Sequence, residues 1–179
     1  MNNILDIHNF SYKHPDRDPL FNNIDLQIAE SQKIALVGRN GVGKTTLLNC
    51  IYNHDNIPSI KLYTTPYFVR QNTEYYKNSS VGEVLGVEKK IEALNAISKG
   101  STSQSDYDMI GDDWDIENKI KIALSYWELG GFDLNLRFDT LSGGEKVKVL
   151  LSAITLHQPK FVLLDEPTNH LDHSSREKL

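Results

Sequence analysis

The sequence predicts an α/β fold with a mostly parallel core sheet, and two apolar runs carry that prediction. Residues 34–37 are continuously apolar and run into a glycine-rich turn, and residues 161–164 are continuously apolar and end at two acids. An uninterrupted apolar run of this length is typical of a parallel strand that is buried on both faces. The alternation of apolar and polar residues at 5–8 and 24–29 indicates two further strands, each with one buried face.

The composition is that of a globular chain with room for one ordinary domain. Of its 179 residues, 39% are apolar and 24% are charged. Its apolar runs are far shorter than the roughly 20 residues of a membrane-spanning helix, and its N-terminus lacks the pattern of a signal peptide. The single cysteine, Cys50, fits a reducing compartment and is interpreted as a small buried side chain rather than a catalytic thiol. These features predict a cytoplasmic protein without direct membrane insertion.

The net charge of −5 bears on possible partners. A chain with this acidic balance is not expected to hold nucleic acid by a broad basic face. A local contact with nucleic acid stays open.

Between residues 14 and 19, two prolines and two aspartates predict a turn between the first two strands.

Residues 38–46 read Gly-Arg-Asn-Gly-Val-Gly-Lys-Thr-Thr and contain a complete P-loop pattern. The glycines let backbone N–H groups turn towards phosphate oxygens, and the helix that follows directs its positive end to the same place. Lys44 adds a positive charge, and Thr45 is expected to bind Mg²⁺. The pattern therefore predicts a triphosphate site. The alternative, a chance glycine turn before a helix, does not explain why strand, loop and helix stand in this order.

Two acids, Asp165 and Glu166, follow the second apolar run directly. Ligands collect at the carboxyl ends of parallel strands, so Asp165 is expected to hold Mg²⁺ through its water shell, opposite Thr45. Glu166 lies one residue beyond the strand and is expected to orient and deprotonate an attacking water. The alternative is an exposed acidic loop after a core strand.

A second candidate anion site begins at Ser142. The residues Leu-Ser-Gly-Gly-Glu at 141–145 open a helix whose apolar residues recur at helical spacing, and Pro159 follows its end. A Ser-Gly-Gly helix start offers a hydroxyl and bare N–H groups to an anion. The alternative is an ordinary helix cap.

The middle of the chain, residues 72–140, predicts helices. Ser80 and Glu83 form a capping-box pattern, and a helical stripe follows it. A loop is expected at 100–105. The stripe consists of Val84, Val87, Ile91 and Leu94, a second helix carries Ile116, Ile120, Ala123, Leu124 and Trp127, and an acidic cluster comprises Asp106, Asp108, Asp112, Asp113, Asp115 and Glu117. The stripes are interpreted as core packing, and the acidic cluster as a solvated face rather than a metal site.

The order of these motifs closely resembles the ATP-binding cassette (ABC) family over nearly the whole chain. Residues 38–45 resemble the Walker A motif, 141–145 the family signature and 161–165 the Walker B motif, followed by a D-loop at 171–172. The resemblance implies ATP and Mg²⁺ as ligands. It implies catalytic roles for Glu166 and the Q-loop residue Gln71, and Mg²⁺ contacts from Thr45, Gln71 and Asp165. The implied nucleotide contacts come from Tyr12, Gly38, Asn40, Gly41, Gly43, Lys44, Thr45 and Thr46. Ser142, Gly143 and Gly144 of the signature are implied to contact ATP in trans, and Asp172 is the implied D-loop aspartate. Tyr12 is expected to stack on adenine, with core packing as its alternative.

The resemblance also implies an organisation for residues 1–179. We expect one ABC ATPase domain of the P-loop NTPase type, with an antiparallel β subdomain and a helical subdomain at 72–140 that has room for a short arm insertion. Family members continue past the D-loop into a strand that ends in a switch histidine, whereas this sequence ends at Leu179. We therefore expect a truncated N-terminal cassette whose C-terminal strands are missing.

Residues 167–172, Pro-Thr-Asn-His-Leu-Asp, narrow the resemblance to the ABC-F class, whose members act on ribosomes. His170 is interpreted as part of an intersubunit contact, because no partner histidine or cysteine stands at ligand spacing near it. In the family, two cassettes face head to tail and the signature of one closes on ATP held by the other, so a second cassette is the expected partner. Two other interpretations stay open: the ATPase subunit of a transporter docked to a membrane permease, and a truncated, non-hydrolytic nucleotide-binding module.

Overall fold

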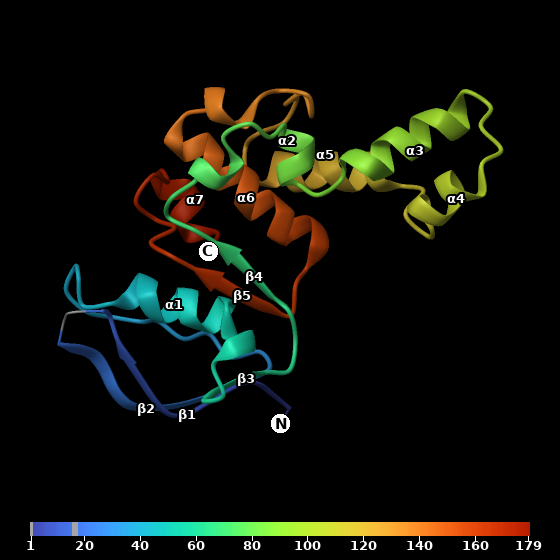
Figure 1. Cartoon of the computed structure of the whole chain (residues 1–179). Coiled ribbons are helices and arrows are strands. Elements are labelled where there is room, and N and C mark those ends of the chain that lie inside the picture. The colour runs from blue at the N-terminus through green and yellow to red at the C-terminus, as the bar shows by residue number, and fades with distance from the viewer. Residues whose placement is uncertain (1, 16–17) are drawn as a thin grey trace. The chain divides into compact units, whose positions relative to one another are not determined.

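The computed structural model describes residues 2–15 and 18–179, and the chain divides into two compact units. Unit 1 consists of Met1–Phe68 and Pro159–Asp165, and unit 2 consists of Val69–Gln158 and Glu166–Leu179. Figure 1 shows their elements in chain order. The turn predicted at residues 14–19 includes positions 16 and 17, which lie outside the described residues.

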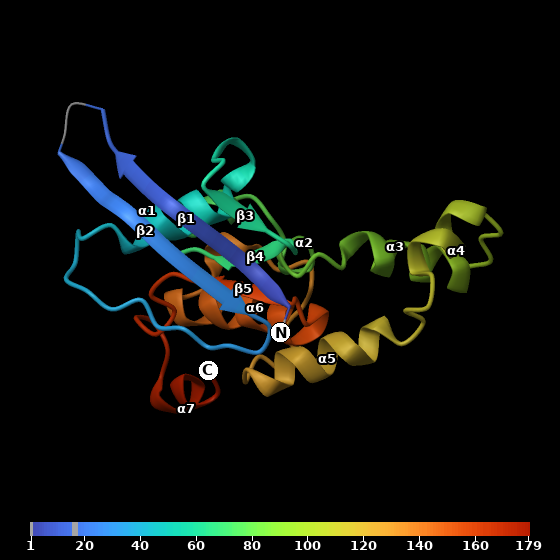
Figure 2. The same ribbon diagram turned by 90° about the horizontal axis from the view of Figure 1, so that it is seen from below.

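Unit 1 contains an antiparallel sheet of three strands in the order β2-β1-β3. β1 (Asn3–Lys13) pairs with β2 (Pro19–Ala29) and with the short β3 (Ile60–Leu62). The first two strands run side by side along their length (Figure 2). Ile7 shows why the register holds: it pairs with Leu26 on one side and Ile60 on the other, and its own side chain is fully buried. The two alternating segments of the sequence are therefore confirmed as strands.

Helix α1 (Lys44–Tyr52) covers this sheet and supplies part of the core of unit 1. Its buried residues recur at helical spacing and pack in one cluster with residues of β1 and β5 (Phe161–Leu164). Cys50 belongs to that cluster and burial raises the pKa of its thiol, as expected of a packing residue. The cluster contains Leu47, Cys50 and Ile51 from α1, Leu5, Ile7 and Phe10 from β1, and Phe161 and Leu163 from β5.

β5 pairs with β4 (Pro66–Val69) in a second, two-stranded sheet, whose strands run in the same direction in Figure 1. The strand predicted from the apolar run at residues 161–164 is confirmed as β5. The strand predicted at residues 34–37 is wrong. These residues adopt no strand conformation, and the side chains of Ile34 and Val37 are 53% and 89% exposed. A doubly buried strand needs neighbours that take up its backbone N–H and C=O groups. In residues 2–15 and 18–179, no strand pairs with this segment.

Unit 2 is mostly helical. Its long helices are α3 (Glu88–Ser98), α5 (Ile116–Tyr126) and α6 (Gly143–His157), and the residues predicted to be buried on α5 are buried. Within unit 2, α3 and α4 pack against each other beyond α5 (Figures 1 and 2). The short elements are α2 (Val81–Val84), α4 (Gln104–Ile110), α7 (His173–Glu177) and the 3₁₀ turns at His54–Asn56 in unit 1 and at Glu74–Tyr76 and Phe138–Thr140 in unit 2.

Of two local predictions in unit 2, the capping box is confirmed and the continuous helical stripe is not. The capping box is confirmed: Ser80 Oγ accepts from the Glu83 N–H at 3.0 Å, and Glu83 accepts from the Ser80 N–H at 2.6 Å. The continuous stripe from Val84 to Leu94 is wrong, because two helices separated by Gly86 carry it. Gly86 has φ 69°, a left-handed conformation that ends α2 and that favours glycine. Among residues 2–15 and 18–179, every helix is too short or too polar to span a membrane.

Candidate functional site

The P-loop of unit 1 ends in a left-handed glycine that begins α1. Gly43 is the N-cap of α1 with φ 105°, and Gly41 has φ 80°. A Cβ at Gly43 would lie 2.8 Å from Leu20 Cδ2 and from Phe21 Cζ. Glycine is therefore required at position 43 both by its backbone conformation and by the close approach of β2. The first N–H groups of α1 have no partner within the helix, which makes this end suitable for an anion.

Lys44 folds back over the loop that precedes it. Its Nζ donates to the carbonyl oxygens of Gly38 at 3.0 Å and Arg39 at 3.3 Å. The ammonium group thus lies against the backbone of the loop. The remaining predicted nucleotide contacts lie in the same loop and first turn: Asn40 is exposed, and Thr46 is half-buried on α1.

Thr45 and Asp165, which lie far apart in the sequence, meet in unit 1. Thr45 Oγ1 donates to Asp165 Oδ1 at 2.9 Å, and Asp165 is only 4% exposed at the end of β5. Mg²⁺ prefers oxygen ligands, keeps several waters and is often held by one carboxylate beside phosphate groups. A hydroxyl and a carboxylate at hydrogen-bond distance beside a glycine loop fit that donor set. These two residues would hold the ion.

Glu166 has two hydrogen-bond donors in unit 2. Gln71 Nε2 donates to Glu166 Oε2 at 3.2 Å, and Asn169 Nδ2 donates to the same oxygen at 2.7 Å. Glu166 has φ 48°, a left-handed conformation that is uncommon for a residue with a side chain. The structure therefore brings Gln71 to Glu166, as the predicted catalytic pair requires. Sequence reasoning did not find Asn169 as the second donor; its place three residues after Glu166 was the available signal.

Tyr12 lies on β1 in a group of aromatic rings. Its ring centroid is 6.4 Å from that of Phe21 and 5.0 Å from that of His14. Phe21 is also the residue that approaches Gly43. The half-buried Tyr12 is thus one aromatic ring away from the P-loop, and it also takes part in packing.

The signature segment begins α6 with a capping box. Ser142 Oγ accepts from the Glu145 N–H at 3.3 Å, and the Glu145 carboxylate accepts from the Ser142 N–H at 2.8 Å. The bond from Ser142 lowers the pKa of Glu145, so this acid stays charged over the helix end. One N–H of the predicted anion site is therefore taken by the chain itself, while Gly143 and Gly144 follow in the first turn.

His170 lies against this helix start. A Cβ on Gly143 would meet the His170 ring at 3.3 Å, and a Cβ on Gly144 would lie 2.8 Å from the His170 carbonyl oxygen. The two glycines thus allow the chain after Glu166 to pass close to α6. The predicted role of His170 in a contact between subunits stays a prediction, and the contact that the structure gives is within one chain.

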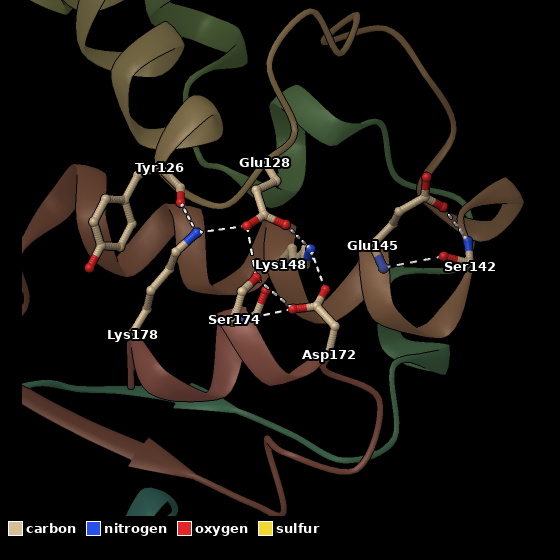
Figure 3. A network of polar contacts seen from close by, with 9 residues as sticks. Tyr126, Glu128, Ser142, Glu145, Lys148, Asp172, Ser174 and Lys178 are labelled. Carbon is tan, nitrogen blue, oxygen red and sulfur yellow. Dashed lines mark hydrogen bonds and ion pairs between the residues drawn. The ribbon is translucent and has the colours of Figure 1, made fainter.

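Asp172 takes part in a polar network that the sequence did not predict (Figure 3). Lys148 Nζ lies 2.8 Å from Asp172 Oδ2 and 2.9 Å from Glu128 Oε2. Lysine bonds hold the pKa of Glu128 down at about 2 and also lower that of Asp172. A lysine placed among the apolar residues of α6 was the only signal in the sequence, because a charge at such a position requires a partner.

The comparisons with known proteins agree with these motifs. Residues 21–169 match the family described as ABC transporter. The chain is 29% identical over 179 residues to ATP-binding protein Uup from Escherichia coli, covering 86% of this chain and 27% of Uup. It is 28% identical over 186 residues to energy-dependent translational throttle protein EttA from Escherichia coli, covering 90% and 33% of the two chains. It is 28% identical over 182 residues to energy-coupling factor transporter ATP-binding protein EcfA2 from Methanospirillum hungatei, covering 100% and 45%.

Solved structures give the same fold. An ATP-binding subunit of an ABC transporter aligns with a TM-score of 0.70 at 19% identity, covering 97% of this chain and 70% of the other. A nucleotide-free ATP-binding cassette from an ABC transporter aligns with a TM-score of 0.61 at 17% identity, covering 98% and 73%. The predicted α/β fold of an ABC nucleotide-binding domain is thereby confirmed.

The chain spans between 27% and 45% of the length of the three curated relatives above. What those whole proteins do therefore does not transfer directly to it. The match over residues 21–169 includes the P-loop, the signature segment and both acids after β5. The chain accordingly belongs to the ABC transporter family, as one of its ATP-binding cassettes.

Proposed function

We propose that the P-loop of this chain binds ATP with Mg²⁺ and that the chain hydrolyses ATP when a second cassette completes the site. The observation that carries the proposal is the 2.9 Å hydrogen bond between Thr45 and Asp165, which brings together two of the three predicted Mg²⁺ residues within unit 1. When bound, Mg²⁺ would supply positive charge to the phosphate oxygens. The N–H groups at the start of α1 and the Lys44 ammonium would hold the phosphates themselves.

Glu166 is the proposed general base for the attacking water. A base must be oriented as well as basic, and the amides of Gln71 and Asn169 fix one of its carboxylate oxygens. The other oxygen would accept the proton of the water as it attacks the terminal phosphate. Gln71 is proposed to contact Mg²⁺ in addition, as the resemblance to the family implies.

The signature residues Ser142, Gly143 and Gly144, together with Asp172, are proposed to contact ATP held by the partner cassette. The start of α6 supports this role, because the first turn of a helix presents N–H groups to an anion. In such a head-to-tail arrangement a lone cassette lacks part of the groups that stabilise the transition state. We therefore expect the isolated chain to turn over slowly.

An ABC-F role on the ribosome is the process we favour. The Asn169-His170 pair supports it, and so does the similarity to EttA, whose name describes a translational throttle. The second candidate is the ATPase subunit of a transporter, supported by the similarity to EcfA2 over the whole chain. Sedimentation of the purified chain with ribosomes, with and without ATP, separates the two: ATP-dependent co-sedimentation favours the first, and its absence favours a permease partner.

The nucleotide site itself is tested by Lys44→Ala. Because the phosphates lose a charged hydrogen-bond donor while the loop keeps its glycines, affinity for ATP should fall about 10- to 100-fold. Titration with a fluorescent ATP analogue measures it. Lys33→Ala, which removes an exposed lysine upstream of the loop, is the matched control and should bind like the wild type. Equal affinity in both variants would mean that the phosphates do not lie at Lys44.

A further inference from the structure

Lys148 connects two segments that are distant in the sequence. It lies on α6, three residues after the signature, and its side chain is only 12% exposed. Its Nζ bonds Asp172 in the segment that leads into α7 and Glu128 in the turn that follows α5. Figure 3 shows Lys148 between these two carboxylates.

Asp172 fixes the start of α7 as well as accepting from Lys148. It is the N-cap of α7, and its Oδ1 accepts from the Ser175 N–H at 2.8 Å and from the Ser174 hydroxyl at 2.9 Å. The carboxylate therefore uses one oxygen for the local cap and the other for α6. The bond to Lys148 therefore restrains the movement of Asp172 relative to α6.

A second lysine shares only half of this arrangement. Lys178 Nζ lies 3.0 Å from Glu128 Oε1 and 2.8 Å from the Tyr126 carbonyl oxygen. Of the two lysines in the cluster, only Lys148 bonds both carboxylates. Removing Lys178 would thus leave the connection between α6 and Asp172 in place.

The segment before Asp172 is held at a second point on the same helix. A Cβ on Gly144 would lie 2.8 Å from the His170 carbonyl oxygen. The backbone at His170 therefore passes directly over the first turn of α6. Gly144 and Lys148 are four residues apart on α6, a separation of about 6 Å along the helix. The chain from His170 to Asp172 therefore follows α6 for about one turn, with one contact at each end.

Stability alone does not account for such a connection. The side chains of Glu128 and Asp172 are 47% and 51% exposed, and ion pairs with exposed partners contribute little to folding. A connection that restrains two segments at little gain in stability is suited to fixing their relative position. These two segments are the start of α6 and residues 170–172. Both belong to the surface that the proposed function assigns to the partner's nucleotide.

We propose that Lys148 is a positioning residue, which locks residues 170–172 onto α6 so that the signature and Asp172 meet the partner cassette as one rigid surface. This inference rests on the proposed function of the signature and D-loop in trans. Lys148 itself would touch neither the nucleotide nor the attacking water. Its effect would reach the reaction through the position of Asp172.

Three variants of the chain test the proposal. Lys148→Met keeps the length of the side chain and removes its charge, Lys148→Arg keeps the charge, and Lys178→Met is the matched control that removes the other lysine of the cluster. In Lys148→Met we expect ATP binding at the chain's own P-loop to stay unchanged, because that loop lies in unit 1. We expect kcat for ATP to fall about 3- to 30-fold with little change in KM. Lys148→Arg should restore most of kcat, and Lys178→Met should resemble the wild type.

Amide hydrogen exchange at residues 170–176 supplies a readout that does not depend on turnover. Exchange there should accelerate in Lys148→Met and in neither of the other variants, since only that change frees Asp172 from α6. Should the wild type bind ATP without measurable turnover, this comparison decides alone. Unaltered exchange in Lys148→Met, or an unaltered kcat alongside faster exchange, would overturn the proposal. An equal loss of kcat in Lys178→Met would show that Lys148 only stabilises the cluster in general and would also overturn the proposal. A wild type that binds no ATP would instead refute the proposed function.

Discussion

Glu166 illustrates how single residues of this chain are constrained. Its φ of 48° is a conformation that side chains disfavour, and two amides, from Gln71 and Asn169, hold one of its oxygens. Strained backbone of this kind persists only where surrounding contacts determine it, and it gathers at functional sites. The preceding residue, Asp165, is buried and accepts from Thr45 instead. Two adjacent acids thus have different partners, as their different proposed roles require.

Glu166→Gln tests the role of the base at the residue scale. The amide retains hydrogen-bonding capacity but cannot take a proton, so turnover should fall about 10²- to 10⁴-fold while ATP stays bound. Phosphate release and titration with an ATP analogue measure the two quantities. Glu177→Gln, which changes an exposed acid on α7, should leave both unaltered. Wild-type turnover in Glu166→Gln would remove Glu166 from the mechanism.

At the scale of elements, the start of α6 combines a helix cap with a close crossing of the chain. The capping box of Ser142 and Glu145 fixes where the helix begins, and the next two glycines let His170 approach. The two approaches differ in kind, because Gly143 meets a ring that can rotate while Gly144 meets backbone. This difference makes the pair a matched test of the crossing.

Gly144→Ala should destabilise the chain, and Gly143→Ala should not. The new Cβ at position 144 would lie 2.8 Å from a backbone oxygen, so the segment at His170 must move. Overpacking of this kind costs typically 1 to 3 kcal/mol, against a gain of at most about 1 kcal/mol from replacing glycine in a helix. At position 143 the ring of His170 can yield. Urea unfolding followed by circular dichroism measures both variants; equal stabilities would show that the chain does not cross α6 this closely.

At the scale of the whole molecule, lowered carboxylate pKa values gather in unit 2. Lysine bonds bring Asp113 from 3.8 to about 2 and Glu128 from 4.5 to about 2. A hydrogen bond from Arg137 lowers the pKa of Asp139, and one from Ser142 lowers the pKa of Glu145. Each of these acids binds its proton more weakly in the folded chain than in the unfolded chain. Their contribution to stability is therefore present above the unfolded pKa and is lost as the pH falls through the folded value.

The free energy of unfolding should accordingly decrease as the pH falls from about 4.5 to about 2. Trp114 and Trp127 both belong to unit 2, so urea titrations followed by tryptophan fluorescence report on the unit that holds these acids. High salt should reduce the pH dependence, because these carboxylates are partly exposed and their ion pairs are screened. Asp113→Asn should reduce the pH dependence of the free energy of unfolding. Asp25→Asn in unit 1 is the control and should leave that dependence unchanged. A stability that stays constant between these pH values would contradict the lowered pKa values.

Local sequence patterns determined most elements of this chain. Alternation gave β1 and β2, the glycine loop and the spacing after it gave α1, and the Ser-Gly-Gly start gave α6 at its observed beginning. Such features could be predicted because burial periodicity and caps involve residues within a few positions of each other. The residues of the P-loop and of the acids after β5 were identified for the same reason.

Tertiary structure decided what depends on distant neighbours. Residues 34–37 are as apolar as 161–164, yet only the second run is a strand, because a strand forms where another backbone pairs with it. The bond from Gln71 to Glu166 and the bridge from Lys148 to Glu128 and Asp172 likewise join residues that are up to 95 positions apart. No local period encodes such pairs, since folding alone brings the side chains within hydrogen-bond distance. The sequence by itself therefore determined the motifs and their local conformation, while packing decided which of them meet.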